Sequence, residues 1–517
     1  MRSITSPLSL IVFASSLALA ACGGGAGAPA PASTSPSTSP STSAATSARA
    51  SAAASVSGAA ASGSPAQRIG GTVAVVASWG GEEQNSFMAE LQPFEQQTGI
   101  QVQYTGTRDL NGVLTTRVQA GNPPEVAALP NPGAMMQFAN AGKLVDLTNV
   151  VDQNQMKAQY APNWETLGTV NGKLVGIFVK ADLKSTVWYD PKTFNNVSVG
   201  NPPKTWQDLM SLDDKISGSG TTPWCVGLES AATSGWPGTD WLSDIMMRTA
   251  GPSAYQQWYS GQLPWTSSEV RNAWQMWGQI VANPKMVYGG SQYMLSTNFA
   301  NAGTPLFSNP PGCYMERQGD FITANYTSNN PNLKAGTDFS YFPFPDINSQ
   351  YGGVTQVSGD MVGMFKDTPQ ARALIKYLTT PEAQAIWVKR GGALSPNKNV
   401  ATNDYPDQLS QKLAQTLVGA QTPLFSAADM MPNTMQTAFY KAVLNYVQNP
   451  NQLDSILASL EQTRQTASAS SGAAAGAAGS ASAKPAASTA ASAGSSVAAS
   501  SKPAASSTAP SSSTTAS

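Results

Sequence analysis

The stretch 222–241 combines side chains that are typical of a carbohydrate site. Its twenty residues include three tryptophans, two acids and a cysteine, namely Trp224, Cys225, Glu229, Trp236, Asp240 and Trp241. Tryptophan covers the C–H face of a sugar ring, and carboxylates accept hydrogen bonds from its hydroxyls. A turn-rich segment whose tryptophans only pack in the hydrophobic core would have the same composition. We interpret Glu229, Trp236 and Asp240 as candidates for ligand contact, and Trp224 and Cys225 as scaffold.

A second group of candidates lies near the start of the globular part of the chain. Residues 78–83 read Ser-Trp-Gly-Gly-Glu-Glu after a short apolar run. Trp79 offers a stacking face, and the two glycines let the backbone approach a ligand closely. Glu82 and Glu83 are candidate hydrogen-bond acceptors, although acids at a helix N-terminus also suit the helix dipole. The Gly-x-Gly-x-x-Gly spacing of a dinucleotide site is absent from this segment.

Cys225 and Cys313 are two of the three cysteines in the chain. The third, Cys22, follows a predicted export signal and is expected to carry a lipid, as described below. Cys225 and Cys313 are then the only remaining pair, and in an exported protein such a pair is expected to form a disulfide. Two buried free thiols are the alternative. The bond would hold the tryptophan-rich stretch against Arg317 and Gln318, which are candidate donors to sugar hydroxyls, Arg317 in bidentate fashion.

The composition excludes several classes of site. Charged residues make up 11% of the chain and the formal net charge is −1, which argues against a nucleic-acid-binding surface. The sequence has no histidine, so Ser-His-Asp and Cys-His catalysis and histidine-ligated metals are excluded. Three cysteines are too few for an all-cysteine structural zinc site. We therefore expect no cofactor, no metal and no nucleic-acid partner.

Strand-like and helix-like segments alternate between residues 72 and 129. Strands are predicted at 72–78, 100–104 and 125–129, and the intervening segments carry apolar residues at helical spacing: Phe87, Leu91 and Phe94, then Leu110, Leu114 and Val118. This alternation predicts an α/β domain with a parallel sheet. Ligands bind such sheets at the carboxyl ends of the strands, which correspond here to the loops at 78–83 and 130–133.

Three predictions concern the middle of the chain. A β-hairpin is expected at 170–179 around an Asn-Gly turn, followed by a strand at 186–189. One helical stripe, formed by Val270, Trp274, Trp277 and Val281, is interpreted as core. The glycines of the segment 352–363 are expected to place Asp360 on a tight turn that faces a cleft.

The two ends of the chain are predicted to lie outside the fold. Residues 1–21 have the features of an export signal, and they end in Leu-Ala-Ala-Cys, which resembles the lipobox of bacterial lipoproteins. The resemblance implies that Cys22 is the lipid-bearing N-terminus of the mature protein, anchored to the cell membrane. Residues 22–67 are rich in Gly, Ala, Ser and Pro and are expected to form a flexible tether, and 467–517 a disordered tail.

Several motifs together resemble the extracellular carbohydrate-binding proteins of ABC importers, in particular the α-glucoside-binding type. They are Ser78-Trp-Gly-Gly-Glu82, Pro130-Asn-Pro-Gly133, Lys184-Ser185-Thr-Val-Trp188, the segment 223–230, Gly235-Trp-Pro-Gly-Thr-Asp-Trp241, Arg317-Gln318, Gly359-Asp-Met361 and the block 364–398. The resemblance covers about 71–464. It implies an α/β, two-lobed periplasmic-binding-protein-like fold of type II over 68–466, with interleaved lobes joined by a hinge.

The same resemblance implies a function. A carbohydrate, expected to be an α-glucoside, would bind between the lobes and be delivered to a membrane permease driven by a separate ATPase. The protein would be a monomer, located in the periplasm or on the cell surface, and would not be an enzyme. Asn131, Lys184 and Ser185 join the candidate ligand-binding residues because they match the family's motifs.

Two other classes are considered. A secreted glycoside hydrolase also uses paired carboxylates near tryptophans, and its release of reducing ends from α-glucosides would distinguish it. A structural cell-wall adhesin fits the low-complexity ends of the chain but not the α/β core.

Overall fold

The computed structural model describes residues 68–198 and 201–480, with side chains described as far as residue 467. The expected signal peptide, Cys22, the tether up to residue 67 and the segment 481–517 lie outside these residues. The described part contains two β-sheets and two hydrophobic core clusters. We call the six-stranded sheet with its helices lobe 1 and the four-stranded sheet with its helices lobe 2. The second sheet contributes to both clusters, since Trp188, Cys313 and Tyr341 belong to the first.

Lobe 1 is built on a six-stranded sheet in the order β12-β11-β3-β1-β2, with β6 also paired to β11. The strands are β1 (Thr72–Ala77), β2 (Gln101–Gly106), β3 (Val126–Leu129), β6 (Ile177–Leu183), β11 (Val354–Met364) and β12 (Thr422–Phe425). Strand β1 is parallel to both β2 and β3, as the sequence predicted. Strand β11 is antiparallel to β3 and β6 and parallel to β12.

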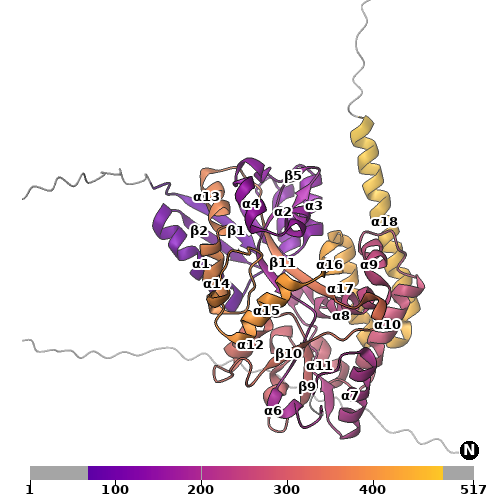
Figure 1. Cartoon of the computed structure of the whole chain (residues 1–517). Helices are drawn as coiled ribbons and strands as arrows, with labels where there is room; N and C mark the ends of the chain where they lie inside the picture. The colour runs from indigo at the N-terminus through magenta and orange to yellow at the C-terminus, as the bar shows by residue number, and fades with distance from the viewer. Residues whose placement is uncertain (1–67, 199–200, 481–517) are drawn as a thin grey trace, which may run out of the picture. The chain divides into compact units, whose positions relative to one another are not determined.

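Helices pack around this sheet (Figure 1). They include α1 (Glu82–Thr98), α2 (Leu110–Gln119), α3 (Pro132–Asn140), α13 (Pro369–Leu378) and α14 (Pro381–Arg390). Phe87, Leu91 and Phe94 of α1 are buried in the core of lobe 1, which confirms the predicted apolar face. Gly99 ends α1 in the left-handed conformation, with φ 71°.

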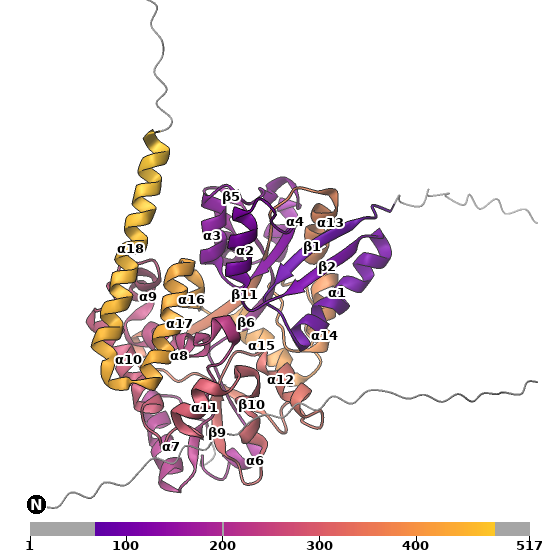
Figure 2. The same cartoon turned by 180° about the vertical axis from the view of Figure 1, so that it is seen from behind.

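Lobe 2 contains the second sheet, in the order β10-β7-β9-β8, and a thick layer of helices (Figure 2). Its elements include β7 (Thr186–Tyr189), β8 (Thr222–Trp224), β9 (Cys313–Arg317), β10 (Ser340–Pro343), α7 (Trp206–Gly218), α8 (Trp236–Thr249), α9 (Gly251–Tyr259), α10 (Ser268–Val281), α11 (Gly290–Ser296), α12 (Ile322–Asn329) and α17 (Asn433–Gln448). The stripe of α10 is at most 4% exposed, so its interpretation as core is confirmed.

The two sheets are joined by strands that pass from one lobe to the other. Strand β6 in the first sheet is followed, after Lys184 and Ser185, by β7 in the second. Strand β11 runs alongside β6 over most of its length. This pair of crossing strands forms the hinge region and connects the two cores.

Asp360 does not occupy a tight turn, and that prediction was wrong. It lies inside β11, opposite Lys180 of β6, next to a register shift between Asp360 and Met361. The neighbouring glycine serves close packing of the strands, because a Cβ on Gly359 would lie 2.5 Å from the carbonyl oxygen of Lys180.

Cys225 and Cys313 form a disulfide with a Cα–Cα distance of 5.6 Å, which confirms the predicted pair. The bond joins the end of β8 to the start of β9, and both cysteines are fully buried. It therefore fixes the tryptophan-rich stretch to the strand that carries Arg317.

The remaining elements complete the surface. They are α4 (Gln153–Gln159), α5 (Pro162–Leu167), the hairpin β4 (Thr169–Val170) and β5 (Lys173–Leu174), α6 (Pro191–Phe194), α15 (Gln408–Gly419), α16 (Ala427–Met430), α18 (Leu453–Ser480) and seven short 3-10 helices. Helix α18 continues past residue 467, where the sequence predicts the tail to begin. Among residues 68–198 and 201–480, no helix is both long and apolar enough to cross a membrane.

Candidate functional site

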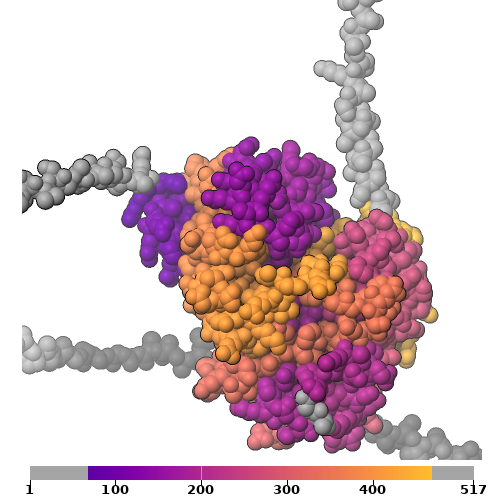
Figure 3. All heavy atoms as spheres, in the orientation of Figure 1, coloured from indigo at the N-terminus to yellow at the C-terminus, as the bar shows by residue number. Residues whose placement is uncertain are grey.

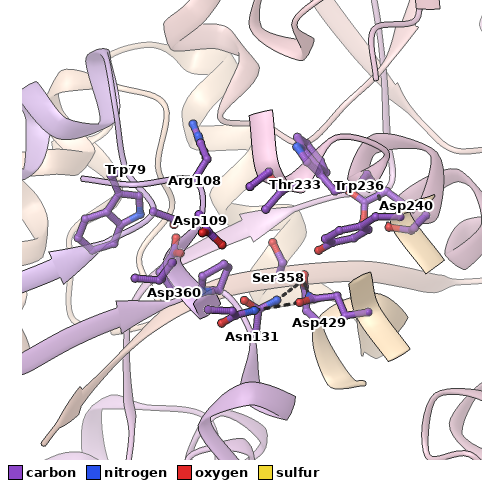
Figure 4. A pocket seen from close by; sticks show the side chains of 18 of the residues that line it. Trp79, Arg108, Asp109, Asn131, Thr233, Trp236, Asp240, Ser358, Asp360 and Asp429 are labelled. Carbon is purple, nitrogen blue, oxygen red and sulfur yellow. Dashed lines mark hydrogen bonds between the residues drawn. The ribbon is translucent and has the colours of Figure 1, made fainter. Parts of the chain in front are cut away.

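A cavity of about 340 Å³ lies between the lobes and is lined by residues of both. Figure 4 shows Trp79 and Asp360 at one end, Trp236 and Asp240 at the other, and Asn131 and Asp429 between them. On the face drawn in Figure 3, the orange segment before α17 lies between the purple part of lobe 1 and the magenta part of lobe 2. The cavity volume is near the lower end of the range for small-molecule sites.

The lobe 1 wall is made by the loops that follow the three parallel strands. Trp79 follows β1, Arg108 follows β2 and Asn131 follows β3, and all three line the cavity. This is the edge of the sheet at which ligands were expected to bind. Trp79 is only 1% exposed, because its ring packs against Phe87 and Trp387 at centroid distances of 4.7 and 4.9 Å. Trp79 therefore borders the cavity without an open stacking face.

A cluster of charges on β6, β11 and α1 forms the floor of this end. The Lys180 ammonium lies 2.9 Å from Asp182, 3.2 Å from Glu83 and 3.5 Å from Asp360. Alternation along the strands places Lys180 and Asp182 on the same face as Ser358 and Asp360 of β11. Glu83 also pairs with Arg108 at 3.3 Å. These carboxylates converge on one cation, while the second oxygen of Glu83 pairs with Arg108 and that of Asp182 accepts from Ser358.

Burial changes the proton affinity of this cluster. It raises the pKa of Asp360 to about 6, an effect that the Lys180 charge opposes and that Asp182 and Glu83 reinforce. Burial alone would lower the pKa of Lys180, but its carboxylate neighbours hold that pKa well above the usual range. Lys180 thus stays charged in the cavity, whereas Asp360 titrates close to neutral pH.

A second buried network supports the lobe 2 end. Lys184 donates to Asp240 at 3.0 Å, and Gln356 donates to the other Asp240 oxygen at 2.8 Å. Burial would raise the pKa of Asp240, but the charges of Lys184 and Arg317 bring it below its ordinary value. Asp240 lines the cavity, yet its hydrogen-bonding capacity is largely used within the protein. Its main effect is to hold Lys184 in place.

Three predicted ligand contacts, Ser185, Arg317 and Gln318, lie behind the cavity wall and do not line it. Arg317 is buried and donates through Nε and Nη2 to Asp244, at 3.0 and 2.5 Å. Ser185 donates to the other oxygen of Asp244. Gln318 accepts a hydrogen bond from the backbone N–H of Gly319. The bonds of Ser185 and Arg317 to Asp244 tie β7 and β9 to α8.

Trp236 forms the aromatic end of the cavity at the start of α8. Its ring packs against Phe299 at 5.1 Å and Phe321 at 5.9 Å, and the Lys184 ammonium lies 4.5 Å from its centroid. The chain enters α8 through Gly235, with φ 104°, where a Cβ would lie 2.3 Å from the Tyr440 carbonyl oxygen. Only glycine fits this approach, which sets the position of the indole.

Glu82 and Glu229 do not line the cavity either. Glu82 lies in the first turn of α1 and accepts a hydrogen bond from Asn85. Glu229 accepts hydrogen bonds from the backbone N–H of Ala231 and from Asn298, both at 2.6 Å. Glu229 therefore braces the loops that carry Thr233 and Phe299 to the cavity.

The sequence interpretation missed several lining residues. Lys180 and Asp182 had a signal, because they are charged residues at alternate positions of an otherwise apolar strand. Asn111, Asp429 and Gln436 had none, since their elements are far apart in sequence. Burial raises the pKa of Asp429 to about 8, so this carboxyl is largely protonated at neutral pH. In the part of the chain that the structure describes, no acidic or cysteine cluster is suited to a metal ion.

Comparison with known proteins identifies the family. Residues 80–385 match the model described as bacterial extracellular solute-binding protein. The chain belongs to this family. This protein is similar to the osmoprotective compounds-binding protein GgtB of Synechocystis. The two are 39% identical over 373 residues, and this alignment covers 71% of this chain and 86% of GgtB. It is also 33% identical over 393 residues to the alpha-glucosides-binding periplasmic protein AglE of Rhizobium meliloti. That alignment covers 74% of this chain and 85% of AglE.

Solved structures support the fold of this solute-binding protein. The solute receptor AcbH aligns with a TM-score of 0.66 at 18% identity, and the match covers 77% of this chain and 99% of AcbH. Maltose-bound MalE3 of T. maritima gives a TM-score of 0.62 at 18% identity, with coverage of 77% and 99%. The family and the two-lobed type II fold implied by the sequence are therefore confirmed.

Proposed function

We propose that this protein is the extracytoplasmic sugar-binding component of an ABC importer and that its ligand is a small α-glucoside. The observation that carries the proposal is the cavity between the lobes, where Trp236 provides an aromatic wall beside a floor of carboxylates and ammonium groups. Such surfaces suit a polyhydroxylated ring, because carboxylates accept hydrogen bonds from its hydroxyls and ammonium groups donate hydrogen bonds to them.

The relatives support this choice of ligand class. Two proteins at 39% and 33% identity are named for binding osmoprotective compounds and alpha-glucosides. The cavity of about 340 Å³ suits a ligand of one or two rings better than a long oligosaccharide. Trp79, Glu83, Asn131, Lys184, Trp236, Asp240 and Asp360 are the predicted contacts that we retain, because each lines the cavity.

The cellular setting completes the proposal. Cys22 would carry the lipid anchor and residues 22–67 would act as the tether, which at about 5–6 Å × √n reaches roughly 35–40 Å from a membrane surface. The closed, ligand-bound monomer would then dock on a permease that is driven by a separate ATPase.

The test is calorimetric titration with maltose, trehalose, sucrose and a longer maltodextrin. We expect micromolar binding of at least one disaccharide, with a change in tryptophan fluorescence. Trp236→Ala should weaken binding by about 10–100-fold while leaving the melting temperature nearly unchanged. Tyr288→Ala, which removes a surface aromatic outside the cavity, is the matched control and should bind like wild type. Lack of binding by all four sugars would refute the proposal.

A glycoside hydrolase remains the competing class. Asp360, with its raised pKa, lies in the same cluster as Asp182 and Glu83, so a pKa argument alone does not separate the two classes. The convergence of all three carboxylates on Lys180 favours a binding site, because each of them is already paired with that ammonium group. Release of reducing sugar from the bound disaccharide would decide for the hydrolase.

A further inference from the structure

A chain of amide and carboxyl groups crosses the cleft between the lobes. Asn131 of lobe 1 donates to Asp429 Oδ1 at 2.9 Å, and Gln436 of α17 donates to the same oxygen at 3.1 Å. Asn111 of α2 in turn donates to Gln436 Oε1 at 3.2 Å and to Asn433 Oδ1 at 2.9 Å. We call these five residues the amide relay. It connects two elements of lobe 1 to helices α16 and α17, and Figure 4 shows Asn131 beside Asp429.

The relay fixes the orientation of every amide in it. Asp429 Oδ1 accepts from Gln436, whose amide directs Nε2 toward this oxygen and Oε1 away from it. That oxygen then accepts from Asn111, and both amide hydrogens of Asn111 are used across the cleft. Reversing the Asn111 amide would lose both bonds. The orientation of Asn111 Oδ1 is therefore coupled to the amides of Asn433 and Gln436 on α17.

Asn111 Oδ1 is left as an unused acceptor. The atom is buried and has no hydrogen-bond partner among the described residues, and Asn111 lines the cavity. A buried acceptor without a partner costs about 1–3 kcal/mol. A ligand that places a hydroxyl here removes that cost on binding, whereas a ligand without a donor at this point does not.

We propose that Asn111 is a specificity-determining residue: the amide relay closes the cleft and presents Asn111 Oδ1 to accept a hydrogen bond from a hydroxyl of the bound sugar. The second half of this inference rests on the proposed sugar-binding function. The first half concerns the protein alone, because the relay bonds join the lobes before any ligand binds. The two halves therefore have separate tests.

The relay is tested without ligand by small-angle X-ray scattering. Asn111→Ala removes both bonds from α2 to α17 and should increase the radius of gyration of the ligand-free protein, because the lobes open. Asn111→Asp keeps the oxygens but loses both donors, and should open the lobes in the same way. Asn329→Ala, on α12 and outside the cavity, is the matched control. An unchanged radius of gyration in both Asn111 variants would overturn the role of the relay.

The acceptor is tested by calorimetric titration. The ligands are the disaccharide that binds wild type most tightly, chosen from maltose, trehalose and sucrose, and the monodeoxy derivatives of that disaccharide. One derivative should bind wild type about 5–150-fold more weakly than the parent, which corresponds to 1–3 kcal/mol. Asn111→Ala should lose this discrimination, because it removes the acceptor.

Each outcome of the titration has a defined meaning. If wild type and Asn111→Ala discriminate equally against every derivative, Asn111 does not read a hydroxyl and the inference is wrong. If no disaccharide binds wild type, the proposed function and the acceptor role both fail, and the scattering result alone decides the relay. Circular dichroism of both variants establishes that they are folded before either measurement.

Discussion

Glu316 is a buried acid outside the cavity, and its replacement by glutamine gives a direct measurement of the cost of burial. It lies on β9, is 2% exposed, and accepts a hydrogen bond of 2.5 Å from the hydroxyl of Tyr326. Burial raises the pKa of Glu316 to about 8, although the Tyr326 hydrogen bond lowers it. The folded protein therefore keeps this proton through a range of pH in which the unfolded chain releases it.

The sign and size of the effect follow from linkage. Between the ordinary pKa of 4.5 and the folded value of about 8, the folded state holds one more proton at this site than the unfolded state. The free energy of unfolding therefore falls as the pH rises through this window. At pH 7 the accumulated loss is about 3 kcal/mol, at 1.36 kcal/mol per pH unit. Glu316→Gln has no proton to release and should not show this loss.

The assay is urea unfolding of wild type and Glu316→Gln at several pH values from 4.5 to 8. The difference in free energy of unfolding, variant minus wild type, should increase by about 3 kcal/mol between pH 4.5 and 7. Glu382→Gln, at an exposed position of α14, should show a nearly constant difference. A constant difference for Glu316→Gln as well would refute the reasoning, because Glu316 would then be ionised in the folded protein.

Three further predictions concern the hinge, the disulfide and the charged floor. Lys184→Met should destabilise the protein by about 3–5 kcal/mol in urea unfolding, because it removes a buried partner of Asp240; a loss below 1 kcal/mol would argue against this network. Replacing both Cys225 and Cys313 by serine should cost up to about 4–5 kcal/mol, since the bond closes a loop with a separation of 88 residues; an unchanged unfolding midpoint would contradict this. Sugar affinity should rise as the pH increases through about 6, where Asp360 ionises and becomes a stronger acceptor, and titrations of Asp360→Asn should lack that step.

The periodic parts of the fold could be predicted from the sequence. Apolar runs and helical faces between residues 72 and 129 gave the strands β1, β2 and β3 and the helices between them, and the disulfide followed from the small number of cysteines. The loops at Trp79 and Asn131 were placed correctly at the cavity, because parallel strands bring their carboxyl ends to one edge.

The partners of buried polar groups could not be predicted in this way. Arg317 and Ser185 resemble ligand-binding residues by type, but both are used by Asp244. Asp360 was assigned to a turn because glycines surround it, whereas Gly359 serves close packing against β6. Asn111 and Gln436 meet only after two lobes have formed, and no local pattern indicates such a pair.

The position of β11 in the chain also has a consequence for the order of folding. This strand lies between β3 and β12 and pairs with β6, so it completes a sheet whose first strands come from the start of the globular part. Until residues 354–425 have been synthesised, β3 has an unpaired edge and the hinge lacks one of its two strands. Sheets closed by such distant segments form slowly. The nascent chain therefore lacks this pairing partner for most of its synthesis, and an unpaired strand edge is prone to aggregation.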